Sequence, residues 1–559
     1  MSMRHILITT ARELGVKDTV KPTRKPRVLL ELRPAFDGYA GIPQETRLLF
    51  RGLRMLESCE VAGMLQTSHR ILAKGTPKDN TLLEALWLTE ALKINRYSRV
   101  VLSAAERPYI TVLDRLLEAC ERRLLSVRLT LQALVDLSST KLWTFRGKYF
   151  EDFIWRALFA KSLPASDFEL VTSARQLVCR LPWNTMHMAG LNTLMFRRQA
   201  KYPKLRTSGI DIFISQTPFP GRVTRGTSMV VRYHDALPVF MPHTIPDKSL
   251  HQATHFHALS ANVRAGARFA CVSEATRNDL LRMFPQAETQ AVVIHNMVSH
   301  HYFNENSDPE LVPGIIRARL HEGDPTKGLE VQPKFLTLRE QESFYARNLR
   351  KKPLRYLLCV STIEPRKNHV RLLAGWEVLK ASIDPDIKLV VVGGLGWDYA
   401  LTLRGFRPWI DRGELFMLNA VPAPDLRVLY RHATATVCPS VGEGFDFSGV
   451  EAMRSGGVVI ASGIAVHREV YGDAAAYFDP YSTAELVAAL KQVLYGDHGA
   501  RVQEHLRSRG EEVSARYLPA QILPQWDRFL SQVFAGRKAA IAEAVARPVT
   551  APVGATEEI

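Results

Sequence analysis

A regular alternation of short apolar strands and helical segments through residues 353–515 constrains the fold more than any other feature of this sequence. Strands that alternate with helices form parallel sheets, because a parallel pair of strands needs a crossover connection. We therefore expect an α/β fold with a doubly wound sheet, which binds ligands at the carboxyl ends of its strands. The expected strands are "RYLLCVST", "IKLVVVGG", "LFMLNAV", "ATVCPS", "GVVIAS" and "AAYFDP".

The first half shows the same rhythm more weakly. "RVLLEL" at 27–32 precedes a glycine loop with Gly38 and Gly41 and then an amphipathic helix. From residue 208 short strands return, in "GIDIFISQ", "SMVVRYHD", "RFACVSE" and "AVVIHNMV". Residues 81–200 between them are expected to be largely helical. Their basic, apolar helix faces fit a membrane surface or, as we expect, the protein core.

A chain of 559 residues is too long for one hydrophobic core, so two domains are expected. We place an amino-terminal domain at 27–303 and a carboxyl-terminal domain at 353–515. Residues 304–352 are polar and weakly patterned, which predicts a partly flexible insertion and linker. The remaining segments are a basic leader at 1–26, a helix at 516–536 and a disordered tail at 537–559.

Composition narrows the class of protein. A formal charge of +17 favours polyanionic binding partners, which include nucleic acid, anionic lipid and phosphorylated substrates. The six cysteines are scattered, with neither paired nor metal-like spacing, and we expect reduced thiols in the cytoplasm. The first residues do not resemble a secretory signal, and no apolar run approaches the length of a membrane span.

The loop after the first strand of the second half is a candidate phosphate site. In "VSTIEPRKNHVRLL", Arg366 and Lys367 stand at a strand end, and Asn368 is expected to cap the helix that follows. Paired cations beside free N–H groups of a helix terminus suit a diphosphate. The alternative is a solvated basic turn.

Two further loops carry candidate residues. "LVVVGGLGW" runs into glycines that include Gly394, where a ligand can approach the backbone or where the chain only turns tightly. "EGFDFSGVE" places Glu443 in a loop and Glu451 on the next helix, which Asp446 or Ser448 is expected to cap. An ionised carboxylate accepts hydrogen bonds from the two hydroxyls of a ribose. A helix cap with an incidental glutamate remains the other interpretation.

"EGFDFSGVEAMRSGGVVIAS" resembles the E-x7-E signature of retaining glycosyltransferases with the GT-B fold, of the family 4 or group 1 type. "VSTIEPRKNHVRLLAGW", "VVGGLGW" and "VHREVYGDAAAYFDP" follow in the order and spacing of that family. The resemblance is strong over 353–515 and looser over 27–70 and 208–300. It implies two Rossmann-like domains that face each other across a cleft.

The resemblance also implies roles for individual residues. Arg366 and Lys367 would hold the diphosphate of a nucleotide sugar, and Glu451 its ribose. Glu443 would lie beside the transferred sugar. The backbone N–H groups that follow Glu443, including that of Phe445, and the backbone at Gly394 would complete the donor site.

In the amino-terminal half, "VRYHDALPVFMP" resembles the strand-end histidine motif of the family. The motif would place His234 near the sugar and Asp235 behind it. "GYAGIPQ" occupies the place of the family's glycine loop but lacks its adjacent glycines, so Gly41 carries over more safely than Gly38. "QILPQWDRFL" resembles a terminal helix that crosses back to the first domain, with Trp526 as its anchor.

The implied reaction transfers a hexose from a nucleoside diphosphate sugar with retention at the anomeric carbon. The amino-acid sequences of the motifs most resemble those of bacterial polysaccharide mannosyltransferases. GDP-mannose is the favoured donor, with no further cofactor and no metal, and a glycan or a lipid-linked molecule at the inner face of the membrane is the expected acceptor. The alternatives are rhamnosyl or glucosyl transfer, an epimerase or phosphorylase, a nucleic-acid binder, and a catalytically silent scaffold.

Overall fold

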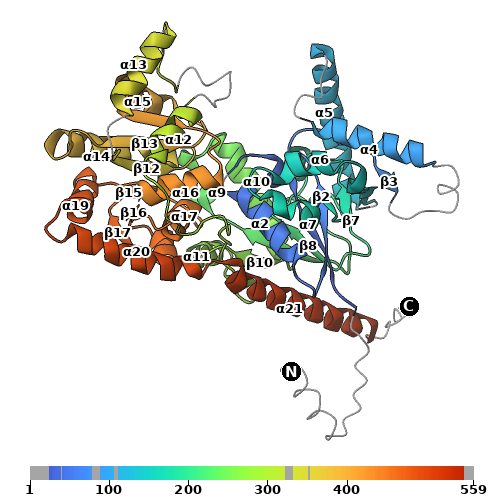
Figure 1. Ribbon diagram of the computed structural model, residues 1–559. Helices are drawn as coiled ribbons and strands as arrows, with labels where there is room; N and C mark the ends of the chain where they lie inside the picture. The colour runs from blue at the N-terminus through green and yellow to red at the C-terminus, as the bar shows by residue number, and fades with distance from the viewer. Residues whose placement is uncertain are drawn as a thin grey trace, which may run out of the picture.

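The computed structural model describes residues 24–39, 41–77, 89–105, 111–136, 138–320, 331–349 and 353–546. The described chain forms two α/β domains, each built on its own sheet (Figure 1). This agrees with the fold expected from the sequence.

The first domain contains a nine-stranded sheet in the order β11-β10-β9-β8-β1-β2-β6-β5-β3. Its pairs are parallel except those that β5 makes with β6 and β3. Val28 and Leu30 of β1 face one hydrophobic cluster and Leu29 faces another, because side chains alternate along a strand. The strands are β1 (Arg27–Glu31), β2 (Glu60–Leu65), β3 (Thr76–Pro77), β5 (Trp143–Phe145), β6 (Gln176–Val178), β8 (Ile212–Ser215), β9 (Ser228–Tyr233), β10 (Arg268–Cys271) and β11 (Ala291–Val293).

Helices cover both faces of this sheet. A separate parallel pair of short strands, β4 (Thr140–Lys141) and β7 (Leu205–Arg206), lies outside it. The helices are α2 (Ile42–Arg54), α4 (Glu90–Ala104), α5 (Val112–Val135), α6 (Glu151–Ile154), α7 (Phe168–Thr172), α8 (Trp183–Asn192), α9 (Leu237–Phe240), α10 (Lys248–Arg264) and α11 (Glu274–Met283).

The second domain contains a six-stranded parallel sheet in the order β14-β13-β12-β15-β16-β17. The strand order reverses between β12 and β15, so the loops after these two strands diverge there and leave room for a ligand. The strands are β12 (Tyr356–Val360), β13 (Lys388–Val392), β14 (Leu415–Leu418), β15 (Ala435–Cys438), β16 (Val459–Ser462) and β17 (Ala475–Phe478). The helices are α14 (His369–Ser382), α15 (Ala400–Arg412), α16 (Ala423–His432), α17 (Phe447–Arg454), α18 (Ala465–Tyr471), α19 (Thr483–Leu494) and α20 (Gly499–Ala515).

The region expected to be largely helical differs from the prediction in two ways. Strands β5 and β6 belong to the main sheet, and each has only three residues, too few to show a period in the sequence. The expectation that its apolar helix faces are core is wrong for one face of α5, which is exposed. Residues 81–88, 106–110 and 137 of this region lie outside the described residues.

The insertion between the domains is more ordered than its composition suggests. Helix α12 (Leu311–Arg319) packs against α16, and helix α13 (Leu338–Asn348) follows it. Ile316 and Phe344 are buried in the hydrophobic cluster that also contains strands of the second sheet. Residues 321–330 and 350–352 lie outside the described residues.

The last helix, α21 (Pro519–Ala546), runs along the lower edge of the view from the second domain to the first (Figure 1). It packs against α2, β8 and β9, and Trp526 is fully buried. The helix continues beyond residue 536, where the sequence predicted a disordered tail, and residues 547–559 lie outside the described ones. So do residues 1–23 of the expected leader. No helix in the described ranges is long and apolar enough to span a membrane.

The two domains contact each other where α11 and α18 meet. Both oxygens of Glu469 accept hydrogen bonds from the first N–H groups of α11, those of Glu274 (2.7 Å) and Ala275 (3.0 Å). The Glu469 carboxylate also lies 2.9 Å from His295 Nε2. A carboxylate from one domain therefore satisfies a helix terminus of the other and holds the domains together.

Candidate functional site

The predicted cationic pair lies in a short 3-10 turn, Pro365–Lys367, directly after β12. Arg366 Nη1 is 2.7 Å from Glu443 Oε2, and Lys367 Nζ is 2.5 Å from Glu443 Oε1. Glu443 lies in the loop after β15, the neighbour of β12 in the sheet. The structure therefore brings these three predicted site residues into one cluster at the carboxyl ends of adjacent strands.

The cluster is shielded from water. The side chains of Lys367 and Glu443 are 12% and 6% exposed. Burial alone would raise the pKa of Glu443, but the charges of Arg366 and Lys367 hold it below its usual range. Burial would lower the pKa of each cation, but attraction to Glu443 outweighs it and raises both. All three groups are therefore charged at neutral pH.

Glu364, which the sequence analysis missed, adds a second carboxylate to the cluster. Its Oε1 is 2.6 Å from Arg366 Nε. Burial raises the pKa of Glu364, although the neighbouring cations oppose this. The motif "IEPRK" contains the residue, but no pattern in the sequence shows that its side chain turns back on Arg366.

Asn368 shapes the cationic turn in an unexpected way. It stands at the amino terminus of α14 with a left-handed backbone (φ 57°), but its side chain does not cap the helix, so that prediction is wrong. Its amide instead donates to the carbonyl oxygens of Pro439 (3.0 Å) and Pro480 (2.9 Å). Asn368 thus ties the turn to the loops after β15 and β17.

The stretch "EGFDFSGVE" forms the loop after β15 and the start of α17. Asp446 caps this helix as predicted, since its Oδ1 accepts from the N–H of Ser448 (3.2 Å). Its Oδ2 lies 3.1 Å from His467 Nε2. Within the described chain, no acceptor takes the N–H groups of Gly444, Phe445 and Asp446. These N–H groups are available to an anionic ligand.

Glu451 occupies the other end of this stretch and is buried, with 4% of the residue exposed. It accepts hydrogen bonds from Gln44 Nε2 of α2 (2.7 Å) and from the Tyr430 hydroxyl (3.2 Å). Burial raises the pKa of Glu451 to about 7. A side chain of the first domain thus contacts the carboxylate to which we assigned the ribose. The sequence analysis missed Gln44, because nothing in the sequence links positions so far apart.

His234 and Asp235 follow β9 and approach the cluster from the first domain. His234 is buried, and its Nε2 has no hydrogen-bond partner among the described residues. Burial, with the charge of Arg232, holds the pKa of His234 well below its usual range, so the imidazole is neutral at physiological pH. A Cβ on Gly444 would lie 1.9 Å from the His234 carbonyl oxygen, so only glycine allows this approach of the two domains.

The remaining predicted positions lie around the same cleft. Gly41 precedes α2 with φ 71°, and a Cβ there would meet no atom of the described residues within 4 Å. Gly394 also has room, with Asn419 Oδ1 as its nearest neighbour at 3.8 Å. The Phe445 ring is buried against Phe447 and Tyr517, so only its backbone can face a ligand.

A cavity of about 710 Å³ lies at the carboxyl ends of the first sheet. Loops after β1, β2 and β8 supply part of its wall, and Trp397 of the second domain closes another part through a 2.8 Å hydrogen bond to the Thr244 carbonyl. Its position at the strand ends, with walls from both domains, suits a second substrate. The sequence analysis missed its residues, which include Arg33, His69, Trp183, His187, His251 and His255.

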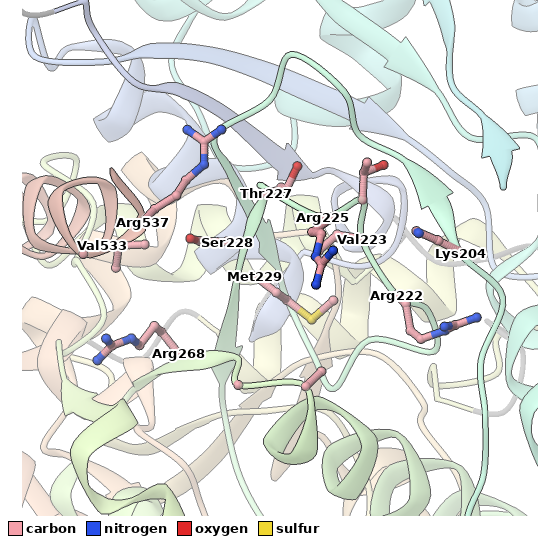
Figure 2. A pocket seen from close by; sticks show the side chains of 14 residues that line it. Lys204, Arg222, Val223, Arg225, Thr227, Ser228, Met229, Arg268, Val533 and Arg537 are labelled. Atoms are coloured by element: carbon pink, nitrogen blue, oxygen red, sulfur yellow. The ribbon is translucent and has the colours of Figure 1, made fainter. Parts of the chain in front are cut away.

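A second cavity, of about 640 Å³, lies at the opposite ends of the strands, near the amino ends of β9 and β10. Its wall contains Lys204, Arg222, Arg225, Arg268 and Arg537. The side chains of Arg222, Arg268 and Arg537 point away from one another rather than toward a common centre (Figure 2). Arg537 also pairs with Asp211. This cavity lacks the convergent cations of the cluster at Glu443.

Among the residues that the structure describes, no group of three or more His, Cys, Asp or Glu side chains is placed to hold a metal ion.

Comparison with known proteins agrees with this geometry. Residues 340–513 match the family described as glycosyl transferases group 1. These residues form a group 1 glycosyltransferase domain. The cluster of Arg366, Lys367 and Glu443 lies within it, as does Glu451.

Two relatives of the chain are O-antigen mannosyltransferases. The chain is 35% identical over 146 residues to O-antigen chain mannosyltransferase B of Escherichia coli, which is 25% of this chain and 37% of that protein. It is 32% identical over 139 residues to O-antigen chain mannosyltransferase RfbU of Salmonella typhimurium, which is 25% of this chain and 38% of that protein. The matches thus span less than two fifths of these relatives.

The fold is GT-B. Sucrose-phosphate synthase from Thermosynechococcus elongatus superposes with a TM-score of 0.52 at 14% identity, over 92% of this chain and 100% of that one. At this identity the similarity establishes the architecture, in which both domains take part. The group 1 domain is therefore the second domain of a GT-B protein.

Proposed function

We propose that the protein is a retaining glycosyltransferase that moves a hexose, mannose in the first place, from a nucleoside diphosphate sugar to a glycan or lipid-linked acceptor. One observation carries the proposal. Within a group 1 glycosyltransferase domain, Arg366 and Lys367 converge on Glu443 at the point where the sheet reverses its strand order. GDP-mannose is the favoured donor, which the likeness to O-antigen mannosyltransferases supports.

In this proposal the two cations bind the diphosphate. Negative charge grows on the departing diphosphate as the glycosidic bond breaks, so cations held in place beforehand stabilise the transition state. The N–H groups of Gly444, Phe445 and Asp446 would add donors beside them. Since Arg366 and Lys367 would supply positive charge at the diphosphate, the reaction is proposed to need no metal ion.

The other residues take supporting roles. Glu451 would accept hydrogen bonds from the ribose hydroxyls once Gln44 gives way. His234, which is neutral and whose Nε2 has no hydrogen-bond partner in the described part of the chain, would hydrogen-bond a hydroxyl of the sugar. Glu443 is ionised and would lie beside the anomeric carbon. The acceptor oxygen would attack on the face that the diphosphate leaves, and its proton would pass to the departing phosphate.

Thermal unfolding with a panel of nucleotides tests this proposal. We expect GDP and GDP-mannose to raise the melting temperature, because a ligand that binds only the folded state stabilises it by about 2.7 kcal/mol at one hundred times its dissociation constant. UDP, ADP and dTDP with their sugars serve as controls. A shift with another nucleotide instead would mean that the donor carries that nucleotide, as expected of a rhamnosyl or glucosyl transferase. If none of the nucleotides shifts the melting temperature, the protein would instead be a catalytically silent GT-B scaffold.

A further inference from the structure

Helix α5 carries an exposed apolar stripe formed by Leu113, Leu117, Cys120, Leu124, Val127 and Leu131. The intervals of three and four residues place these side chains along one face of the helix. Leu124, for example, is 72% exposed. The helix projects from the first domain at the top of the view (Figure 1).

The stripe points away from the body of the protein. Leu129 and Ala133 on the opposite face of α5 are buried, and α5 packs there against α8. Arg122 on that face donates to the His69 carbonyl oxygen (3.1 Å), and the Glu118 carboxylate accepts from the Ile71 N–H (3.3 Å). These contacts fix the rotation of α5. A contiguous apolar surface held outward in this way marks an interaction site.

Basic side chains border the stripe. Successive residues of a helix are turned by about 100°, so Arg123 and Arg128, next to Leu124 and Val127, lie on opposite sides of the stripe. Both are exposed, while Glu121 is an exposed carboxylate at the same border. Apolar residues between arginines match a lipid surface that has anionic headgroups over an apolar interior.

A neighbouring segment carries further exposed apolar and basic side chains. Residues 195–198, Met-Phe-Arg-Arg, are all exposed, and Phe196 is 70% exposed. They follow α8, which is joined to α5 where Asn192 Nδ2 donates to Ser126 Oγ (3.4 Å). Lys201 Nζ then donates to the Leu134 carbonyl oxygen (3.2 Å). An exposed aromatic ring with two arginines therefore lies close to α5, next to the face on which α8 packs.

We propose that the stripe of α5, with Arg123 and Arg128 at its borders, docks the protein on a membrane surface that contains anionic lipid. A second copy of the chain fits less well. Parallel pairing of two stripes as a coiled coil would bring Arg123 of one copy next to Arg128 of the other, because these are its flanking g and e positions.

Docking through this surface has a consequence for the cleft. Arg122 joins α5 to His69, and His69 lines the cavity at the carboxyl ends of the first sheet. The surface therefore lies on the same domain as the proposed acceptor site and close to it. Docking would bring the cavity near a lipid-linked acceptor. This consequence rests on the proposed function, whereas docking itself does not.

Co-sedimentation of the full chain with vesicles tests the proposal. Phosphatidylcholine vesicles with and without phosphatidylglycerol are compared for the wild type, for Leu117→Glu with Leu124→Glu, and for Arg123→Gln with Arg128→Gln. The leucine variant is expected to weaken binding by at least about tenfold, since each buried leucine contributes strongly. The arginine variant should lose roughly fivefold in vesicle affinity for each arginine removed, and only on anionic vesicles.

Leu336→Glu with Leu338→Glu is the matched control, because both leucines are exposed at the start of α13 in the insertion, away from α5 in the sequence. It should bind vesicles like the wild type, and all variants should keep the nucleotide response, which separates this proposal from the proposed function. Equal sedimentation of the wild type and the leucine variant would overturn docking through α5. So would a dimer of the wild type that the leucine variant abolishes, because the stripe would then be an interface between copies.

Discussion

Lys367→Ala is expected to lower turnover about a hundredfold, because removal of one preorganised group that stabilises the transition state typically costs about 3 kcal/mol. Lys367 has this role in our account because its Nζ lies in a shielded cluster at the strand ends, 2.5 Å from Glu443. Arg366→Ala is expected to have an effect of the same size. Steady-state rates with GDP-mannose measure both.

The structure also provides the control for this experiment. Each variant leaves Glu443 paired with the other cation, so the fold should survive and the melting temperature should change little. Arg156→Ala removes an arginine of the first domain whose side chain is 77% exposed, and should leave turnover unchanged. Turnover of either cluster variant within a few fold of the wild type would remove the cationic pair from the mechanism.

The second large effect concerns stability. Glu45→Leu is expected to lower the free energy of unfolding by about 3–5 kcal/mol, since loss of one partner leaves a buried charge unpaired. Glu45 lies on α2 and pairs at 2.9 Å with Arg232 of β9, and neither side chain is appreciably exposed. Arg232 also donates to the Ile294 carbonyl oxygen (2.6 Å) and lies over the ring of Trp526. Urea unfolding measures the change.

Asp152→Leu is the comparison for Glu45→Leu. Asp152 forms an ion pair with Arg156 in which both side chains are largely exposed, so its loss should cost less than about 1 kcal/mol. A similar loss of stability for the two variants would contradict the account of a buried, structural pair beneath His234.

The second domain could be predicted closely from the sequence. Strands of a parallel sheet are buried on both faces and appear as continuous apolar runs, as "KLVVV" does in β13. The loops that follow such strands share one edge of the sheet, so Arg366, Lys367 and Glu443 could be expected near one another. Their ion pairs could not be predicted, because side-chain direction within a loop has no periodic signal.

The first domain was harder to predict. Its sheet is extended by β5 and β6, which are too short to show alternation. The spacing in α5 predicts an apolar face correctly, but it does not tell whether another element covers that face. The contact of Gln44 with Glu451 depends on how the two domains meet, which no local pattern contains.

The central claim is that the cationic pair and Glu451 hold opposite ends of one donor. Calorimetric titration tests it most directly, with GDP, 2′,3′-dideoxy-GDP and guanosine as ligands of the wild type, Lys367→Ala and Glu451→Gln. Lys367→Ala should weaken the binding of GDP but not that of guanosine. Glu451→Gln should weaken the binding of GDP but not that of the dideoxy analogue. If each variant weakens the binding of all three ligands by the same factor, neither residue contacts the group assigned to it, and the claim is contradicted.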